Sequence, residues 1–412
     1  MSYLRFLTAG ESHGRALIGI LEGIPSGLPV SVEDIDRDLK RRQSGYGRGA
    51  RMKIESDHAE ILSGVRWRET IGSPITLFIE NKDWKNWQDV MSSEFVNLWQ
   101  KSSESQNLRI ETVIRPRPGH ADLAGAIKYG QHDLRNILER SSARETAMRV
   151  ALGAIAKKFL LEFGIKVGSY VIQIGKIKVQ SSKFKVQSSE KKLLEIFKKA
   201  EKSPVRCPDE ETSEKMIKLI NKVTKEGNSL GGIFEVFVTG APIGLGSHIQ
   251  WDKRLDGRLA QALMGIQAIK GVEIGLGFEI ARNFGSQVMD EIFYSHESEV
   301  MSQKSGGFYR KTNYAGGIEG GITNGMPIIV RAAMKPIPTL KKPLRSVNII
   351  TKEPVEAAYE RSDICAVPAA GVIGEAMAAL IIADVFLEKF GGDSITETKR
   401  NYDSYIEYIK KF

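Results

Sequence analysis

The stretch SSARETAMRVALGAIAKKFLLEFG, residues 141–164, has the pattern of one long buried helix, and the fold class follows from it. Ser142 and Glu145 have the spacing of a capping box, and Gly164 is a residue type at which helices end. The apolar face between these signals is built from small side chains, namely Ala143, Ala147, Val150, Ala151, Ala154 and Ile155. Such a face predicts a helix that packs closely against another element.

Two more segments, 255–271 and 368–392, repeat this composition and are also predicted to be buried helices. Short segments rich in β-branched residues alternate with the helices and predict strands at 72–80, 231–240, 271–281 and 326–336. Buried helices that alternate with strands predict a mixed α/β or α+β architecture.

Length alone, 412 residues, suggests two or three domains, since domains average roughly 150 residues. However, no linker rich in Pro, Gly or Ser divides the chain. The one break in composition is residues 176–202, with nine lysines and three glutamates, which we expect to form a solvated peripheral hairpin or loop insertion. Residues 393–412 are expected to form a helical tail that docks on the body or on a second subunit, because apolar residues recur at helical spacing.

The net charge of +9 does not by itself indicate nucleic-acid binding, because the 176–202 segment carries +6 of it. Cys207 and Cys365 lie far apart without CxxC spacing, so neither a disulfide framework nor a zinc site is predicted. No signal peptide is recognisable at the N-terminus, and the longest apolar run near the C-terminus, 376–383, is too short to span a bilayer. We therefore expect a cytoplasmic protein that does not enter a membrane.

A second stretch, RRQSGYGRGARMK at 41–53, holds five cations and three alternating glycines without a carboxylate. Only one aromatic residue accompanies the cations, which argues against nucleic acid, and the glycines exclude an amphipathic membrane helix. Glycines at alternate positions let the backbone curl, so Arg42, Arg48 and Arg51 can converge on one point. A guanidinium cluster of this kind predicts a small ligand that carries phosphate and carboxylate groups.

Other polar residues gather in turns along the whole chain, at 10–14, 115–122, 139–146, 316–325, 335–339 and 361–370. Each has a purely structural alternative. His13 could be a hydrogen-bonded turn residue, and His120, which follows two prolines, could simply be exposed. Asp363 could be an N-cap or a partner of Arg361.

The start of the 142–164 helix is a more specific signal. Backbone N–H groups at Ser142 and Ala143, the positive end of the helix and the Arg144 guanidinium together suit a phosphate or a carboxylate. An ordinary helix cap with an exposed arginine is the alternative.

Three long motifs identify a family resemblance: GESHGRALIGILEGIP (10–25), ERSSARETAMRVALGA (139–154) and RSDICAVPAAGVIGEAM (361–377). With the arginine stretch, RPRPGHADL (115–123) and KPIPT (335–339), they resemble the chorismate synthase family over about residues 3–390. The resemblance implies a single α+β unit, residues 1–412, folded as a β-α-β sandwich with buried helices between sheets. It also implies a homotetramer built as a dimer of dimers.

The same resemblance implies an activity, the anti-1,4-elimination of phosphate from 5-enolpyruvylshikimate 3-phosphate to give chorismate in the shikimate pathway. The implied cofactor is reduced FMN (FMNH2), with no net redox change and with an external flavin reductase as its source. Because the C6 proton is weakly acidic, an acid–base pair alone would struggle, whereas reduced flavin can lend electron density and recover it.

Residue roles carry over from the family position by position. Catalysis is assigned to His13 as proton donor near the leaving phosphate, to His120 as the group that protonates the reduced flavin, and to Asp363, which assists removal of the flavin N5 proton. The substrate would contact Arg42, Arg48, Arg51, Arg144 and Arg361. The flavin would rest on Ser142, Ala143, Arg144, Gln267, Ala268, Gly320, Lys335, Pro336, Ile337, Pro338, Thr339 and Arg361.

Two rival functions remain open from the sequence. The first is a flavin oxidoreductase that consumes NADPH, although no nicotinamide-binding fingerprint is recognisable. The second is a nucleic-acid-binding protein, whose affinity would fall steeply with salt.

Overall fold

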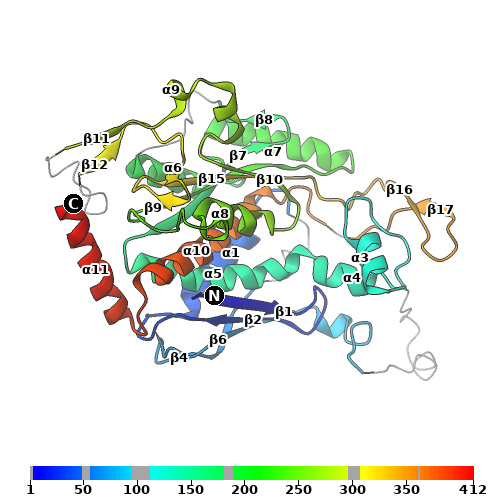
Figure 1. Ribbon diagram of the computed structural model, residues 1–412. Coiled ribbons are helices and arrows are strands. Elements are labelled where there is room, and N and C mark those ends of the chain that lie inside the picture. The colour runs from blue at the N-terminus through cyan, green and yellow to red at the C-terminus, as the bar shows by residue number, and fades with distance from the viewer. Residues whose placement is uncertain (1–2, 49–55, 95–111, 181–188, 296–306, 361) are drawn as a thin grey trace.

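The computed structural model describes residues 3–48, 56–94, 112–180, 189–295, 307–360 and 362–412. Two antiparallel sheets face each other across a layer of helices, so the architecture is a β-α-β sandwich (Figure 1). The predicted α+β fold with buried helices between sheets is confirmed.

Within the described residues, the strands form two main sheets and four short two-stranded pairs. The four-stranded sheet has, in spatial order, β1 (Arg5–Ala9), β2 (Ala16–Glu22), β6 (Ile75–Glu80) and β3 (Glu60–Ser63). The five-stranded sheet has β10 (Ile269–Ile274), β15 (Ile328–Met334), β9 (Gly232–Thr239), β7 (Lys166–Ile174) and β8 (Ile177–Lys178). The pairs are β4 (Val65–Arg66) with β5 (Glu69–Thr70), β11 (Ile292–Tyr294) with β12 (Phe308–Arg310), β13 (Ile318–Glu319) with β14 (Ile322–Thr323), and β16 (Arg345–Val347) with β17 (Pro354–Glu356).

The helical layer consists of α1 (Val32–Gln43), α5 (Thr146–Leu161), α8 (Leu255–Met264) and α10 (Val367–Phe390). The remaining helices are α3 (Asp122–Tyr129), α4 (Arg135–Ser141), α6 (Glu190–Lys202), α7 (Glu210–Lys225), α9 (Gly285–Val288) and α11 (Ile395–Lys411). Short 3₁₀ turns are η2 (Trp84–Asn86), η3 (Ala143–Glu145), η4 (Trp251–Lys253) and η5 (Gly277–Arg282). Helices α5 and α10 run side by side from the same end of the molecule (Figure 1).

The two sheets differ in how they are covered. In β2, alternate residues such as Leu17 and Leu21 face the helices, while Ile18 and Ile20 face outward and are partly exposed. The five-stranded sheet is covered on both faces, because α10 packs on one side and α6 on the other, over Tyr170. Its central strands are therefore almost continuously apolar, as expected for a doubly buried sheet.

Small residues set the spacing of the central layers. A Cβ atom on Gly153 of α5 would lie 2.4 Å from the Cβ of Ala376 in α10. On β2, a Cβ on Gly19 would lie 2.5 Å from Met148 of α5. The close packing predicted from the small-residue face of the 142–164 helix is thus present at both of its neighbours.

Three local predictions were wrong. Ser142 caps only the η3 turn, through a bond from the Arg144 backbone N, and Glu145 turns away to other partners, so the chain has no capping box there. The helix predicted for 255–271 ends at Met264, and β10 starts at Ile269. The strand predicted for 271–281 likewise ends early, because residues 277–282 form η5.

The Lys-rich segment is only partly the predicted peripheral hairpin. Strand β8 pairs with β7, and residues 181–188 lie outside the described parts of the chain. From Glu190 onward the chain is α6, capped by Ser189 and packed on β7 through buried Leu193 and Ala200. The amphipathic spacing of these apolar residues was hidden by the excess of lysines.

Helix α10 is long and apolar enough to cross a membrane by length and composition, but 94% of its most apolar window is buried within the protein. It is a core helix by that measure. The C-terminal helix α11 docks on the body as expected, with Tyr402, Ile406 and Ile409 buried.

We predict opposite effects for the same substitution at two helical glycines. Gly153→Ala should lower the free energy of unfolding by about 1–3 kcal/mol, because its methyl group overpacks the α5–α10 contact. Gly257→Ala, on the exposed side of α8 with no atom closer than 3.9 Å, should raise it by about 0.4–1 kcal/mol. Denaturant unfolding of the two variants measures both changes in the free energy of unfolding. If the two substitutions changed it equally, the close α5–α10 contact at Gly153 would be contradicted.

Candidate active site

Three arginines, Arg42 and Arg48 from one stretch and Arg144 from a distant part of the chain, converge at the C-terminal end of α1. Arg42 is buried and donates from Nη2 to the carbonyl of Ala143 (2.9 Å). Arg144 donates from Nη1 to Asp57 Oδ1 (2.5 Å), and Arg42 lies 3.6 Å from the other Asp57 oxygen. The third, Arg48, pairs with Asp363 at 3.1 Å.

The positive charges in this arginine cluster lie close together. The pKa of Arg42 is lowered to about 10, mainly by burial and also by Arg48 and Arg144, although Asp57 raises it. Among the described residues, the carboxylates of Asp57 and Asp363 pair with these guanidinium groups. An anionic ligand that bound here would offset the mutual repulsion of the buried cations.

The loop after α1 is held against the segment that precedes α10. Gly47 has φ 89°, and its carbonyl accepts hydrogen bonds from the backbone N of Ile364 (2.8 Å) and Cys365 (3.4 Å). A side chain at this position would be strained, and its Cβ would also come within 3.3 Å of Cys365. The alternating glycines do bring Arg42 and Arg48 together, while Arg51 lies outside the described residues.

His13 lies beside the start of η3. Its Nδ1 is 2.8 Å from Glu139 Oε1, and its backbone N donates to Glu139 Oε2, also at 2.8 Å. Ser142 Oγ donates to the neighbouring Ser12 at 3.3 Å, which connects this turn to the arginine cluster. His13 is therefore a partly buried residue with a fixed partner.

His120 has a comparable carboxylate partner. Its Nδ1 lies 2.5 Å from Asp122 Oδ1, and Arg117 binds the same carboxylate. Burial alone would raise the pKa of Asp122, but hydrogen bonds from His120 and Arg117 hold this pKa well below its ordinary value. Arg117 also donates to Thr339 Oγ1 (3.2 Å), so His120 lies next to the 335–339 segment.

A strained turn after α8 joins the 335–339 segment. Ala268 has φ 68°, a left-handed conformation that is costly for a residue with a side chain. Its carbonyl accepts from the Lys335 backbone N (2.9 Å), and the Lys335 ammonium donates to Gly119 O (2.6 Å). Next to Ala268, Gln267 Nε2 donates to Glu145 at 2.7 Å.

These hydrogen bonds and ion pairs, with residues adjacent in sequence, trace one path. It runs from Glu145 through Gln267, Lys335 and His120 to Thr339, whose carbonyl accepts from Ser362 Oγ (3.2 Å). It then passes through Asp363 to Arg48, whose charge lowers the pKa of Arg42, and Arg42 donates to Ala143. We call this the contact chain. Most of the residues predicted from the turns therefore lie along one connected path.

Among the described residues of one protomer, Gly320 does not lie on the contact chain. It lies in the β13–β14 turn, which meets the first residue of α8, where Leu255 N donates to Gly321 O (3.0 Å). Gln267 follows the other end of α8, a helix about 15 Å long. Arg361 lies outside the described residues, as Arg51 does, and the roles of all three stay predictions.

The family model described as chorismate synthase matches residues 4–387. The chain belongs to the chorismate synthase family. The chorismate synthase of Aquifex aeolicus is 59% identical over 413 residues and covers 100% of both chains, and that of Geobacter metallireducens is 57% identical, covering 99% of this chain and 100% of its own. A crystal structure of chorismate synthase superposes with a TM-score of 0.79 at 50% identity, covering 100% of this chain and 99% of its own. As a member of this family, the chain is a carbon–oxygen lyase.

Several polar residues that contact these family positions were not found from the sequence. Asp122 and Glu139 were inside the recognised motifs, and a carboxylate close to a candidate imidazole was the signal that could have found them. Asp57 and Asn81 gave no such signal, because only the fold brings them to Arg144.

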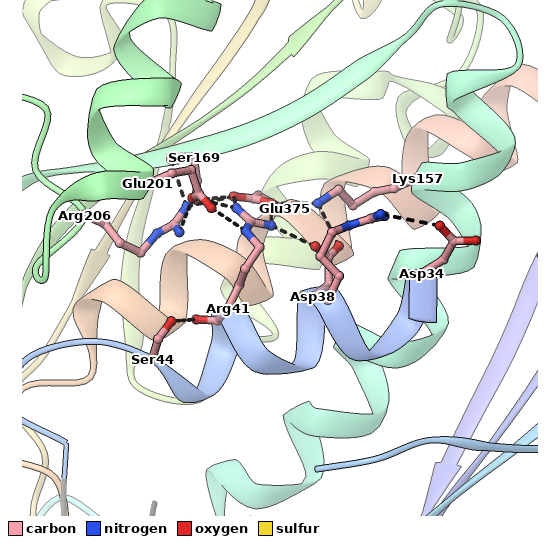
Figure 2. A network of polar contacts seen from close by, with 10 residues as sticks. Asp34, Asp38, Arg41, Ser44, Lys157, Ser169, Glu201, Arg206 and Glu375 are labelled. Carbon is pink, nitrogen blue, oxygen red and sulfur yellow. Dashed lines mark hydrogen bonds and ion pairs between the residues drawn. The ribbon is translucent and has the colours of Figure 1, made fainter. Parts of the chain in front are cut away.

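A second group of charged residues lies around Arg41 of α1, the residue before Arg42 (Figure 2). At its centre the fully buried Glu375 of α10 is bound bidentately by Arg41 (2.7 and 2.8 Å), and Lys157 donates to it at 2.8 Å. The other members are Asp38, Ser169, Glu201 and Arg206. We call this the Glu375 network.

The Glu375 network balances its own charge, three cations against three carboxylates. Burial alone would raise the pKa of Glu375, but Arg41 and Lys157 hold this pKa well below its ordinary value. The network connects α1 to α5, α6 and α10 through Asp38 and Arg41. It therefore holds in place the helix that also carries Arg42.

We predict that Glu375→Gln lowers the free energy of unfolding by about 3–5 kcal/mol at neutral pH, because it leaves buried cations without their shared partner. Since the folded-state pKa is depressed, the ionised carboxylate stabilises the fold above the unfolded pKa of about 4.3 and loses this effect as pH falls below it. The difference between wild type and variant should therefore shrink in acid.

Glu388→Gln is the matched control, a carboxylate on the same helix with a side chain 38% exposed, and should change stability by less than about 1 kcal/mol. Denaturant unfolding between pH 3 and 7 tests both variants. A difference for Glu375→Gln that stayed constant with pH would argue against ionisation as the source of its effect.

Proposed function

We propose that this chain converts 5-enolpyruvylshikimate 3-phosphate to chorismate with loss of phosphate, at the site formed by the arginine cluster and the contact chain. The observation that carries the proposal is the convergence of three guanidinium groups, Arg42, Arg48 and Arg144, of which Arg48 and Arg144 lower the pKa of the buried Arg42. A substrate with one phosphate and two carboxylates carries the opposite charge. Forked guanidinium groups bind such anions with two parallel hydrogen bonds each.

The same site contains a buried hydrogen-bond acceptor that a flavin could satisfy. Among the described residues, no donor lies within hydrogen-bond distance of the buried Gln267 Oε1. A carboxylate can only accept, so the bond to Glu145 fixes Nε2 on that side and leaves the amide oxygen as an unused acceptor. Buried acceptors are seldom left unpaired, and a flavin ring carries N–H donors that would satisfy this one.

We assign the flavin to residues along the contact chain, with Gln267 and Ala268, the segment Lys335–Thr339 and Ser142–Arg144 as its supports. Reduced FMN, when bound, supplies electron density to the allylic C–O bond and takes it back as the C6 hydrogen leaves. Gly320 and Arg361 are the remaining residues that the family resemblance assigns to the flavin.

Proton handling falls to the two imidazoles and Asp363. Because Glu139 engages Nδ1 of His13, His13 would pass its proton to the leaving phosphate from Nε2. Asp122 engages Nδ1 of His120 in the same way, so Nε2 would carry the proton destined for the flavin. Asp363, held by Arg48, would take up the proton at the flavin N5.

The wider setting also follows from family membership. We propose that the enzyme acts in the shikimate pathway in the cytoplasm, as a homotetramer built from two dimers. An external flavin reductase would supply the reduced FMN.

The central prediction is that purified protein, mixed anaerobically with dithionite-reduced FMN and the enolpyruvyl substrate, releases one phosphate per chorismate without net flavin oxidation. His13→Ala and Asp363→Asn should each lower kcat by about 100-fold or more, since each removes a positioned proton carrier. Stopped-flow absorbance and a phosphate assay measure this. Equal turnover with oxidised FMN would overturn the proposal.

The same preparation separates the rival functions. Anaerobic NADPH oxidation without added reductase would indicate intrinsic flavin reductase activity. Tight DNA binding that weakens steeply with salt would instead favour a nucleic-acid-binding protein.

A separate prediction concerns flavin affinity. Gln267→Leu should weaken FMN binding about 3- to 10-fold, the effect of losing one neutral hydrogen bond. Gln261→Leu, an exposed position on α8, is the matched control and should bind FMN normally. Quenching of flavin fluorescence measures affinity without turnover, and unchanged affinity in Gln267→Leu would remove Gln267 from the flavin site.

A further inference from the structure

The imidazole of His13 is stacked on the indole of Trp87. The two ring centroids are 3.8 Å apart with 24° between the planes, which is face-to-face contact. Trp87 follows the η2 turn, and its Nε1 donates to Asp83 Oδ2 at 3.0 Å, so the indole is itself held in place. This stack sets the plane of the His13 ring.

Glu139 sets the rotation of the same ring within that plane. Its carboxylate accepts from His13 Nδ1 and from the His13 backbone N, each at 2.8 Å, and its side chain is only 1% exposed. The Glu139 backbone takes part as well, since its carbonyl accepts from Ser12 N at 3.1 Å. The turn that carries His13 is therefore bound to one residue of α4 at three points.

Arg135, one turn before Glu139 in α4, links the two restraints. Its guanidinium lies 3.6 Å from Glu139 Oε1 and 5.3 Å from the centroid of the Trp87 ring. A cation over an indole is attracted to the ring face, and here it also balances the buried carboxylate. The guanidinium thus links the indole and the carboxylate, the two groups that contact the imidazole.

We propose that Trp87, Glu139 and Arg135 form a cage that positions the His13 imidazole, with Nε2 as the nitrogen that exchanges a proton. None of the three needs to touch the substrate, so they are positioning residues that act through His13. The proposal rests on the proton-donor role given to His13 above. Its physical basis is that a proton carrier held in one plane and one rotation is already oriented for transfer.

The cage predicts losses in kcat rather than in KM. Glu139→Gln keeps the size of the side chain but removes its charge and replaces one accepting oxygen with an NH2 donor, which weakens the hold on His13 Nδ1, and should lower kcat at least about 10-fold. Trp87→Leu removes the stack and should have a similar effect. Trp87→Phe keeps an aromatic face against His13 and should recover most of the activity.

Two matched controls account for general damage. Trp67 is 85% exposed and has its own guanidinium neighbour, Arg66, at 4.1 Å, so Trp67→Phe repeats the Trp87→Phe change away from the cage. Glu235 is a buried carboxylate bound to Arg331 on the α6 side of the five-stranded sheet. Glu235→Gln should lower the melting temperature as Glu139→Gln does, yet leave kcat unchanged.

Fluorescence gives a readout that does not depend on turnover. The emission of Trp87, taken as the difference between wild type and Trp87→Phe, should shift to the red in His13→Ala, because the ring face that the imidazole covers becomes open to water. The same His13→Ala change made in the Trp87→Phe background should produce no such shift.

A double-mutant cycle separates failure of the cage from failure of the proposed function. If His13→Ala lowers kcat and Glu139→Gln adds no further loss in that background, the cage acts through His13. If His13→Ala lowers kcat but Glu139→Gln and Trp87→Leu do not, the cage is overturned while the proposed function stands. If His13→Ala leaves kcat unchanged, the proton-donor role itself fails.

Discussion

Helix α5 can approach α10 as closely as it does only because Gly153 carries no side chain at their contact. This contact holds together the helical layer on which both sheets pack. The two helices also begin at the same end of the molecule, so the segments just before them, Ser142–Arg144 and Asp363, are brought to one place. The geometry of the candidate site thus depends on the spacing of two core helices.

Adjacent residues of α1 show how the fold handles buried charge. Arg41 lies in the balanced Glu375 network, where Glu375 raises its pKa although burial alone would lower it. The pKa of Arg42 is instead lowered to about 10, mainly by burial and also by the neighbouring cations Arg48 and Arg144, although Asp57 raises it. One residue belongs to a charge-balanced network that stabilises the helix, and its neighbour belongs to the arginine cluster proposed to bind the anionic substrate. The two roles are separated by the helical rotation between successive residues.

The long apolar helices were predictable because their pattern is local, and α10 and most of α5 lie where the sequence placed them. The predicted capping box failed because the Glu145 side chain binds Gln267, which is distant in sequence, and Arg149, one turn along the helix, instead of the backbone N–H of Ser142. The 176–202 segment was misread because charge composition outweighed the spacing of Leu193 and Ala200. The first failure thus reflects a contact distant in sequence, and the second reflects composition being weighed above periodicity.

The sequence by itself determined the fold class, the family and most of the candidate residues, since helical periodicity and long motifs are written in neighbouring positions. Only the tertiary structure decided which partners those residues have. Asp57 reaches Arg144, and Trp87 reaches His13, across 87 and 74 positions of sequence, distances that no local pattern can encode. The orientation of a buried side chain depends on hydrogen bonds and stacking that exist only once the core is packed.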